Sequence, residues 1–222
     1  MIERRLAWFG VACVVACLGL FAWLHLSPPS SLLDWRTRTL SQYALLDNGW
    51  AFDVGTLLLA AGSAAVLAAL LRARVFRPGS GAAAGLVLWV AGLVGVVVFE
   101  KHNWSVGPSM SGNIHRAASL LAFLSLPVAA LLAGLSGLRH APARAPALAV
   151  LLAGVAALLC FAPILWALLS EPWTGVRWWR AIPLGTVERL LGLAEVATVL
   201  LLARWATLTP AAAEQPQTTA TA

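Results

Sequence analysis

Six long apolar blocks dominate this sequence and restrict the folds that it can adopt. They cover residues 6–26, 52–71, 83–100, 117–138, 146–169 and 184–204, and most ionisable residues lie between them. A helix needs about 20 apolar residues to cross a hydrocarbon core about 30 Å thick, and in lipid only helices and closed barrels satisfy their backbone hydrogen bonds. The blocks lack the alternation of barrel strands. The sequence therefore predicts an all-α, polytopic membrane bundle of six transmembrane helices.

The two ends of the chain lead to separate expectations. The first block runs on to residue 26 with no small-x-small cleavage pattern behind it, which favours a retained first span over a cleaved signal peptide. The membrane domain is expected to cover residues 1–207. Residues 208–222 consist mainly of Ala, Thr, Gln and Pro without periodicity, which predicts a disordered cytoplasmic tail.

Basic residues at the ends of the blocks predict the orientation. If the N-terminus is inside, eight arginines face the cytoplasm and six basic residues face outward, while the outer loops hold most of the acids. Seven tryptophans also gather on the proposed outer side, as in an aromatic belt. We therefore expect both termini in the cytoplasm and the protein in the cell membrane. The prevalence of arginine over lysine suggests a GC-rich bacterial genome.

The net charge of +6 has two possible partners, nucleic acid and membrane lipid. The arginines are scattered singly at span ends, without the clustering of a nucleic-acid surface. Attraction to anionic membrane lipids explains them better, so lipids are the predicted partners and no nucleic acid is expected. The cysteines Cys13, Cys17 and Cys160 all lie within apolar blocks and are interpreted as packing residues.

The first outer connection, residues 27–51, alternates apolar residues with charges and hydroxyls. This pattern predicts a short amphipathic helix in the outer interface, beginning near Thr39 or Ser41 and ending at Asn48-Gly49.

One acid falls deep inside the last block. Glu195 lies about three turns into it, near the bilayer centre, and Glu188 precedes it by seven residues on the same helix face. Such an intramembrane acid is either a hydrogen-bonded structural group or a functional one. A proton-coupled carrier that uses Glu195 as a relay is the functional alternative, although no internal repeat accompanies it.

A second group of polar residues is expected at the outer ends of the spans, because antiparallel helices bring these ends to one side. Its members, predicted to form a ligand site, are Asp53, Glu100, His115, Arg116, Glu188 and Arg189, with His25 and His102 nearby. The leading hypothesis is a non-catalytic protein that binds a lipid headgroup or small ligand there. The alternative is a purely structural role, in which these residues form a network of paired charges that holds the helix ends together.

Several chemical uses of this group remain open. Asp, Glu and His could bind a divalent metal in a lipid-modifying enzyme, but their spacing matches no known ligand motif. His25 and His115 could in principle ligate a haem, and Ser105, Ser109 or Ser111 could serve a histidine as nucleophile. No metal site and no cofactor are predicted, and whether the protein is an enzyme stays undecided.

Three short segments of the sequence stand out: Leu40-Ser41-Gln42-Tyr43 with Trp50, the Gly-x-x-His turn at Gly112–His115, and the Gly-x-x-x-Arg start of the last span at Gly185–Arg189. In this order and spacing they resemble the domain of unknown function 998 family of small bacterial and archaeal membrane proteins. The chain departs from the family after the third block. The family has a turn that contains Pro and Asp there, and this chain has residues 99–104 without either. The resemblance implies a six-helix fold in a membrane and no particular reaction.

Overall fold

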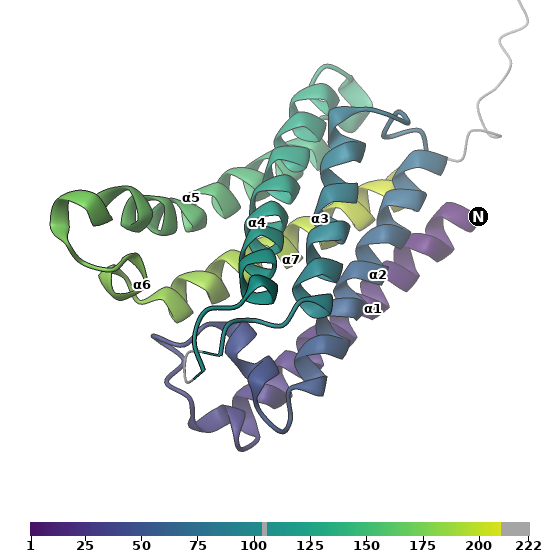
Figure 1. Ribbon diagram of the computed structural model, residues 1–222. Coiled ribbons are helices and arrows are strands. Elements are labelled where there is room, and N and C mark those ends of the chain that lie inside the picture. The colour runs from purple at the N-terminus through teal and green to yellow at the C-terminus, as the bar shows by residue number, and fades with distance from the viewer. Residues whose placement is uncertain (104–105, 210–222) are drawn as a thin grey trace, which may run out of the picture.

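Helices make up most of the part of the chain that the structure describes. The computed structural model, which describes residues 1–103 and 106–209, has six helices that are long and apolar enough to cross a membrane (Figure 1). They are α1 (Ile2–Leu26), α2 (Trp50–Arg72), α3 (Gly81–Val98), α4 (Met110–Gly137), α5 (Arg144–Thr174) and α7 (Leu184–Leu208). The short elements are the helix α6 (Trp178–Ala181) and the 3₁₀ turns η1 (Ser30–Leu32), η2 (Leu40–Leu45) and η3 (Ala141–Ala143). The predicted all-α fold with six spans is confirmed.

Several helices extend beyond the predicted apolar blocks, α4 and α5 the furthest, because polar residues join their ends. Helix α4 begins at Met110, since the Ser109 hydroxyl accepts a hydrogen bond from the Gly112 N–H at 3.0 Å and caps the first turn. Helix α5 runs on to Thr174 with Pro163 and Pro172 inside it, and Gly175 ends it in the left-handed conformation, at φ 66°. The predicted tail at 208–222 falls, apart from its first two residues, outside the described residues.

Small residues set the distances between the helices, as expected for packing in lipid. A Cβ on Gly62 would lie 2.9 Å from the backbone oxygen of Gly10, so α1 and α2 touch through their backbones. A Cβ on Gly92 would likewise meet the Ala118 oxygen of α4 at 2.8 Å. Trp89 of α3 is buried and donates to the Ser63 hydroxyl of α2 at 2.9 Å. These contacts bring four helices close enough to enclose space at one end.

Helix α7 closes the bundle. It packs against α5 on one side and against α1 and α2 on the other, and in Figure 1 it passes behind α3 and α4. We call the end at which residues 27–49, 99–109 and 175–183 connect the helices the loop end. The N-terminus and the last turn of α7 lie at the opposite end. The outward orientation of the loop end stays a prediction.

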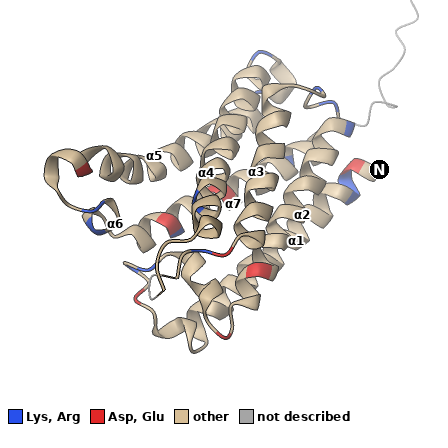
Figure 2. Cartoon of the chain, in the orientation of Figure 1, with Lys and Arg blue, Asp and Glu red and all other residues tan. Residues whose placement is uncertain are grey.

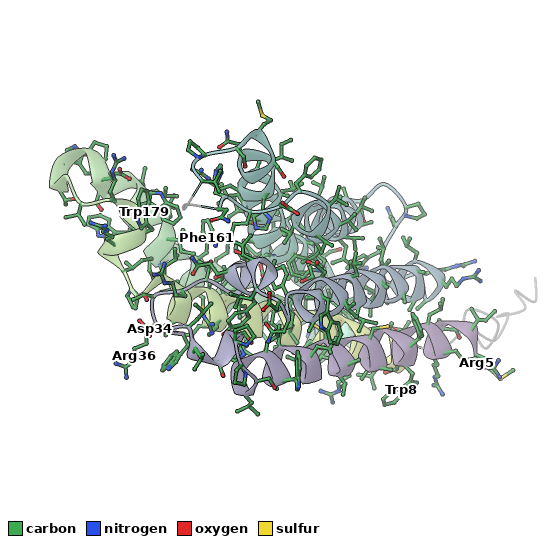
Figure 3. All side chains as sticks on the ribbon, turned by 60° about the horizontal axis from the view of Figure 1, so that its bottom comes forward. Arg5, Trp8, Asp34, Arg36, Phe161 and Trp179 are labelled. Atoms are coloured by element: carbon green, nitrogen blue, oxygen red, sulfur yellow. The ribbon has the colours of Figure 1, made fainter. Side chains whose placement is uncertain are left out.

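Charges are distributed unequally between the two ends (Figure 2). The connections opposite the loop end carry basic side chains, whereas the acids of the described residues belong to the loop end, apart from Glu3 near the N-terminus and Glu195 within α7. In Figure 3, Arg5 and Trp8 mark the end of α1 that lies away from the loop end, and Asp34 and Arg36 mark the first loop. This separation agrees with the charge pattern read from the sequence.

The first loop contains 3₁₀ turns where an amphipathic α-helix was expected. The turn η2 covers Leu40–Leu45, within the predicted segment. Its Tyr43 is 1% exposed and packs with Leu24 and Phe52 in a small core at the loop end. The loop therefore folds inward over the helix ends. Its position at a membrane interface stays a prediction.

Candidate functional site

Two adjoining cavities lie at the loop end and directly beneath it. The loop-end cavity has a volume of about 410 Å³ and is enclosed by the first loop, residues 101–102, and parts of α4, α5, α6 and α7. The inner cavity has a volume of about 510 Å³ and lies among α1, α2, α3, α4 and α7. Ser41, Ser119, Phe123 and Glu188 line both cavities, so the two spaces share a wall.

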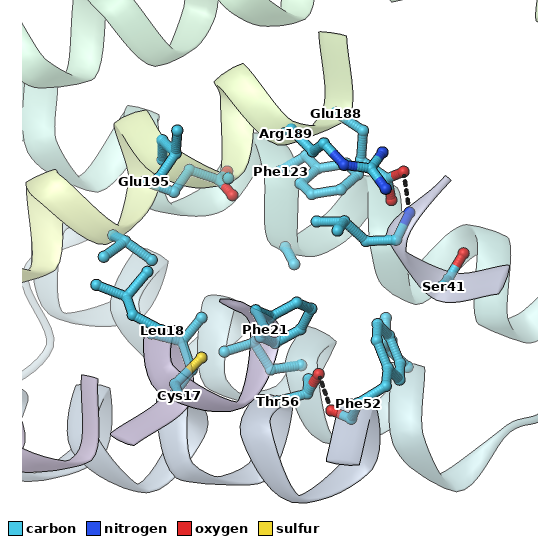
Figure 4. A pocket seen from close by; sticks show the side chains of 18 of the residues that line it. Cys17, Leu18, Phe21, Ser41, Phe52, Thr56, Phe123, Glu188, Arg189 and Glu195 are labelled. Atoms are coloured by element: carbon cyan, nitrogen blue, oxygen red, sulfur yellow. Dashed lines mark hydrogen bonds between the residues drawn. The ribbon is translucent and has the colours of Figure 1, made fainter. Parts of the chain in front are cut away.

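The first loop is fastened to the start of α7 through its backbone. The Arg36 oxygen accepts from the Thr186 N–H at 3.1 Å, and the Leu40 N–H donates to Glu188 Oε2 at 2.8 Å, a bond drawn dashed in Figure 4. Gly185 makes this approach possible. A Cβ there would overlap the Trp35 oxygen at 2.5 Å and lie even closer to the Arg38 oxygen.

Arg189 completes this fastening with its whole guanidinium group. Its Nη1 donates to the Arg38 oxygen at 2.9 Å and its Nη2 to the Tyr43 hydroxyl at 2.8 Å. Its Nε donates to His25 Nε2 at 2.8 Å. The other nitrogen of His25 lies 2.7 Å from the Phe21 oxygen, so the proton of this imidazole is on Nδ1. Arg189 therefore positions the loop and has little capacity left for a ligand.

Three cationic side chains line the loop-end cavity: Arg38, Lys101 and Arg116. The Lys101 ammonium donates to the hydroxyls of Thr39 and Ser41, the latter at 3.0 Å. Burial lowers the pKa of Lys101 to about 8, with Arg38 acting in the same direction and Glu188 opposing it. The cavity thus holds a half-buried amine whose lowered pKa, about 8, brings its titration close to neutral pH.

His115 presents a free nitrogen at the same cavity. Its side chain is 5% exposed, and Nδ1 lies 2.9 Å from the Phe99 oxygen, so Nδ1 carries the proton. Nε2 is then an acceptor, and it is buried without a hydrogen-bond partner. Buried acceptors are nearly always satisfied. This one lacks a partner and belongs to a residue that lines the loop-end cavity.

An apolar floor lies beneath these polar groups. It consists mainly of Leu120 and Phe123 of α4, Phe161 and Ile164 of α5, and Leu184 of α7. Figure 3 shows Phe161 and Trp179 on the α5–α6 side of the cavity. A ligand there would meet cations and an acceptor at one end and hydrocarbon at the other.

The structure distributes the six predicted site residues over three places. His115, Arg116 and Glu188 line the loop-end cavity, and Glu188 also lines the inner cavity together with Arg189. Asp53 and Glu100 line neither cavity: Asp53 is half-buried on α2, and Glu100 is exposed. All six lie towards the same end of the bundle, but the rotation of each helix decides which side chain reaches a cavity.

The other chemical alternatives find little support in this geometry. Within the described residues, no three side chains of His, Cys, Asp or Glu are grouped closely enough to hold a metal ion. His25 is bonded at both nitrogens, which leaves it no free ligand atom for haem. The Ser111 hydroxyl donates to the Glu100 oxygen at 3.0 Å, and Ser109 caps α4. The candidate nucleophile Ser105 lies outside the described residues.

Sequence reasoning missed several residues that build the site. Lys101, Arg38 and Tyr43 were not among the predicted site residues, although the resemblance included Tyr43. One available signal was that Lys101 is the single lysine of the chain. All fourteen other basic residues are arginines. An ammonium group is compact and can lose its proton, whereas a guanidinium group stays charged, so a single lysine marks a position where this difference can matter.

The comparison with protein families supports the resemblance noted in the sequence. A family model described as "Protein of unknown function (DUF998)" matches residues 6–205. The chain belongs to the DUF998 family. No curated protein and no solved structure matches it. The function of this DUF998 chain therefore has to be inferred from the geometry of its own residues.

The three resemblance segments of this DUF998 chain build the loop end. The first and third meet directly, because Tyr43 and Arg189 are hydrogen-bonded across 146 positions of sequence. The second places His115 on the loop-end cavity. Its Gly112 is required by His102, whose ring leaves no room for a Cβ at that position.

Proposed function

We propose that this membrane protein binds an anionic lipid without chemically changing it, with the headgroup in the loop-end cavity. The observation that carries the proposal is the set of cations on an apolar floor: Arg38, Lys101 and Arg116 face a space whose base is hydrocarbon. An amphiphile with a phosphate group has the same two-part character. Such a ligand would reach the cavity from the bilayer in which the helices lie.

The charge balance of the cavity favours an anion. Glu188 is the single acid among the lining residues, against the three cations, and it already accepts a hydrogen bond from the Leu40 N–H. In the described part of the chain, no carboxylate lies within 4 Å of any of the three cations. Lys101 is hydrogen-bonded to hydroxyls and Arg116 to the His102 ring, so their positive charges are not neutralised by an acid. Phosphate oxygens are good partners for such guanidinium and ammonium groups in a partly dry site.

His115 adds a requirement for a hydrogen-bond donor. Its unpartnered Nε2 can accept one hydrogen bond, and a headgroup hydroxyl would supply it. This favours an anionic headgroup that also carries hydroxyls, for which phosphatidylglycerol is a suitable probe. The same free nitrogen could act as a base in a lipid-modifying enzyme, which is the second candidate function.

Binding of fluorescent phosphatidylglycerol to detergent-purified protein tests the proposal. Unlabelled phosphatidylglycerol, phosphatidylcholine and inorganic phosphate serve as competitors. Phosphatidylglycerol should displace the probe best. Arg116→Gln should weaken binding by about 10- to 100-fold, since a hydrogen bond to a charged group contributes about 1.5–3 kcal/mol. Arg180→Gln is the matched control, because Arg180 is exposed and lines neither cavity.

The outcomes separate the candidates. Equal displacement by phosphatidylcholine, or equal weakening in Arg116→Gln and Arg180→Gln, would refute a specific anion site. Displacement by inorganic phosphate as effective as that by the lipid would identify a soluble anion as the ligand. Conversion of phosphatidylglycerol to a new species, followed by mass spectrometry and lost in His115→Gln, would favour the enzyme over a binding protein.

A further inference from the structure

The inner cavity contains an acid that the loop-end cavity does not use. Glu195 is 1% exposed, lies halfway along α7, and has a buried Oε1 without a hydrogen-bond partner. Figure 4 shows its carboxyl group facing the cavity, with Cys17 and Leu18 on the opposite helix α1. A buried carboxyl without a partner is costly, and a ligand in this space would supply the missing partner.

The charged groups around Glu195 do not compensate it. The other ionisable residues that line the inner cavity are Cys17 and His25 of α1 and Glu188 and Arg189 of α7, while the lining residues of α2, α3 and α4 include none. Arg189 is occupied by His25, Tyr43 and two backbone oxygens. Glu195 forms no ion pair within the described residues. The cavity thus offers two acids and a single, already occupied cation.

Aromatic side chains form much of the remaining wall. Phe21 of α1, Phe52 of α2, Trp89 of α3 and Phe123 of α4 all line the inner cavity. Phe21 and Phe52 meet edge to face, with ring centroids 5.7 Å apart. Aromatic faces attract cations, most strongly where water is excluded. The walls and the acid therefore favour the same sign of charge in a ligand.

The cavity is also accessible from the side. Ala22 of α1 and Leu193 of α7 line it and are themselves exposed, Leu193 by 58%. These exposed residues lie on helices that are long and apolar enough to cross a membrane, so this side of the cavity would face lipid. A ligand that enters here has to dissolve in the bilayer first.

We propose that the inner cavity binds a lipophilic monocation, a hydrophobic amine, quaternary ammonium or phosphonium compound, with its charge against Glu195. Without a cation beside it, Glu195 is the neutral acid, because a buried carboxylate without a partner is costly. Binding replaces the carboxyl proton with the cation, and the proton leaves to the aqueous phase, so the charge of the cavity stays balanced. The proposed cation site differs from the proposed lipid site, because Glu195 lines the inner cavity and not the loop-end cavity, although the two cavities share a wall.

Equilibrium dialysis of tetraphenylphosphonium against detergent-purified protein at pH 7.5 tests the proposal. The neutral compound triphenylphosphine oxide is the comparison ligand. We expect saturable binding of the cation and a loss of about tenfold or more in Glu195→Gln, because about 1.4 kcal/mol of charge attraction in a poorly solvated site gives that factor. Asp47→Asn is the matched control, since Asp47 is an exposed acid of the first loop that lines neither cavity.

A second measurement does not depend on how well the Gln variant folds. In weakly buffered solution with a pH indicator, the wild-type protein should release about one proton per bound cation, and the neutral compound should release none. Glu195→Asp should retain binding, because it keeps the acid. The proposal is overturned by the absence of saturable binding to the wild type, by binding in Glu195→Gln as tight as in Asp47→Asn, by comparable binding of the neutral compound, or by binding without proton release.

Discussion

Lys101 gives the proposed lipid site a specific dependence on pH. Burial lowers its pKa from 10.5 to about 8, so the ammonium is about nine-tenths charged at pH 7 and about one-tenth charged at pH 9. The arginines of the cavity keep their charge throughout this range. A phosphodiester headgroup also stays anionic. Raising the pH from 7 to 9 therefore removes one cation and leaves the rest of the site unchanged.

The magnitude follows from the contact that is lost. A hydrogen bond to a charged group contributes about 1.5–3 kcal/mol, so the neutral form of Lys101 should bind phosphatidylglycerol about 10- to 100-fold more weakly than the charged form. Because the charged fraction falls only about tenfold between pH 7 and 9, the measured affinity should fall by about 5- to 10-fold over that range. By linkage, the bound lipid should raise the pKa of Lys101 in return. The variant Lys101→Gln should bind weakly at both pH values and show no decline between them.

Two assays together examine this reasoning. The competition assay described above measures the affinity at pH 7, 8 and 9, and reductive methylation with ¹³C-formaldehyde allows the lysine to be titrated by NMR. Because the chain has a single lysine, the signal lost in Lys101→Gln identifies it beside the N-terminal amine. An affinity that is constant from pH 7 to 9, or an equal decline in Lys101→Gln, would refute the assignment of this cation to the lipid site.

Further tests address stability in detergent, measured as thermal unfolding. Gly185→Ala should destabilise the fold by about 1–3 kcal/mol, because the new methyl group overlaps the first loop, whereas Gly192→Ala, with no heavy atom within 4 Å of the new methyl group, should not; equal effects would contradict this. Tyr43→Phe leaves an N–H of Arg189 unpaired and should cost about 1–3 kcal/mol, and an unchanged midpoint would show that water replaces the hydroxyl. Between pH 8 and 10.5 the unfolded chain holds more protons on Lys101 than the folded one, so stability should rise with pH relative to Lys101→Gln; parallel curves would disprove the lowered pKa.

Span lengths were predictable from the sequence, and side-chain directions were not. The length and apolar character of each block determine that it crosses the membrane, and the seven-residue spacing of Glu188 and Glu195 places both on one face of α7. Asp53 and Glu100 also lie towards the loop end, as expected, but they line neither cavity. How far a helix is rotated depends on small contacts such as Gly62 with Gly10, which no single-sequence pattern encodes.

The first loop illustrates a second limit of sequence reasoning. Its alternating apolar residues favoured an amphipathic α-helix, and they form the 3₁₀ turn of Leu40–Leu45 instead. The loop backbone is held by residues about 150 positions away, through Glu188 and Arg189. Such distant contacts override local helical preference. The family resemblance identified Tyr43 and Arg189 separately, but their contact becomes evident only when the helices are assembled.

The fastening of the first loop to α7 has a consequence for how the protein is made. Five spans have to be synthesised before residues 185–189 leave the ribosome. Residues 36–43 therefore lack their hydrogen bonds to the start of α7 during most of translation. Neither cavity has all its walls until that last span inserts. A chain truncated before residue 184 would retain Lys101 and His115 but would lack Glu188, Arg189 and Glu195. Late closure of this kind means that both cavities form only after the last span has been made.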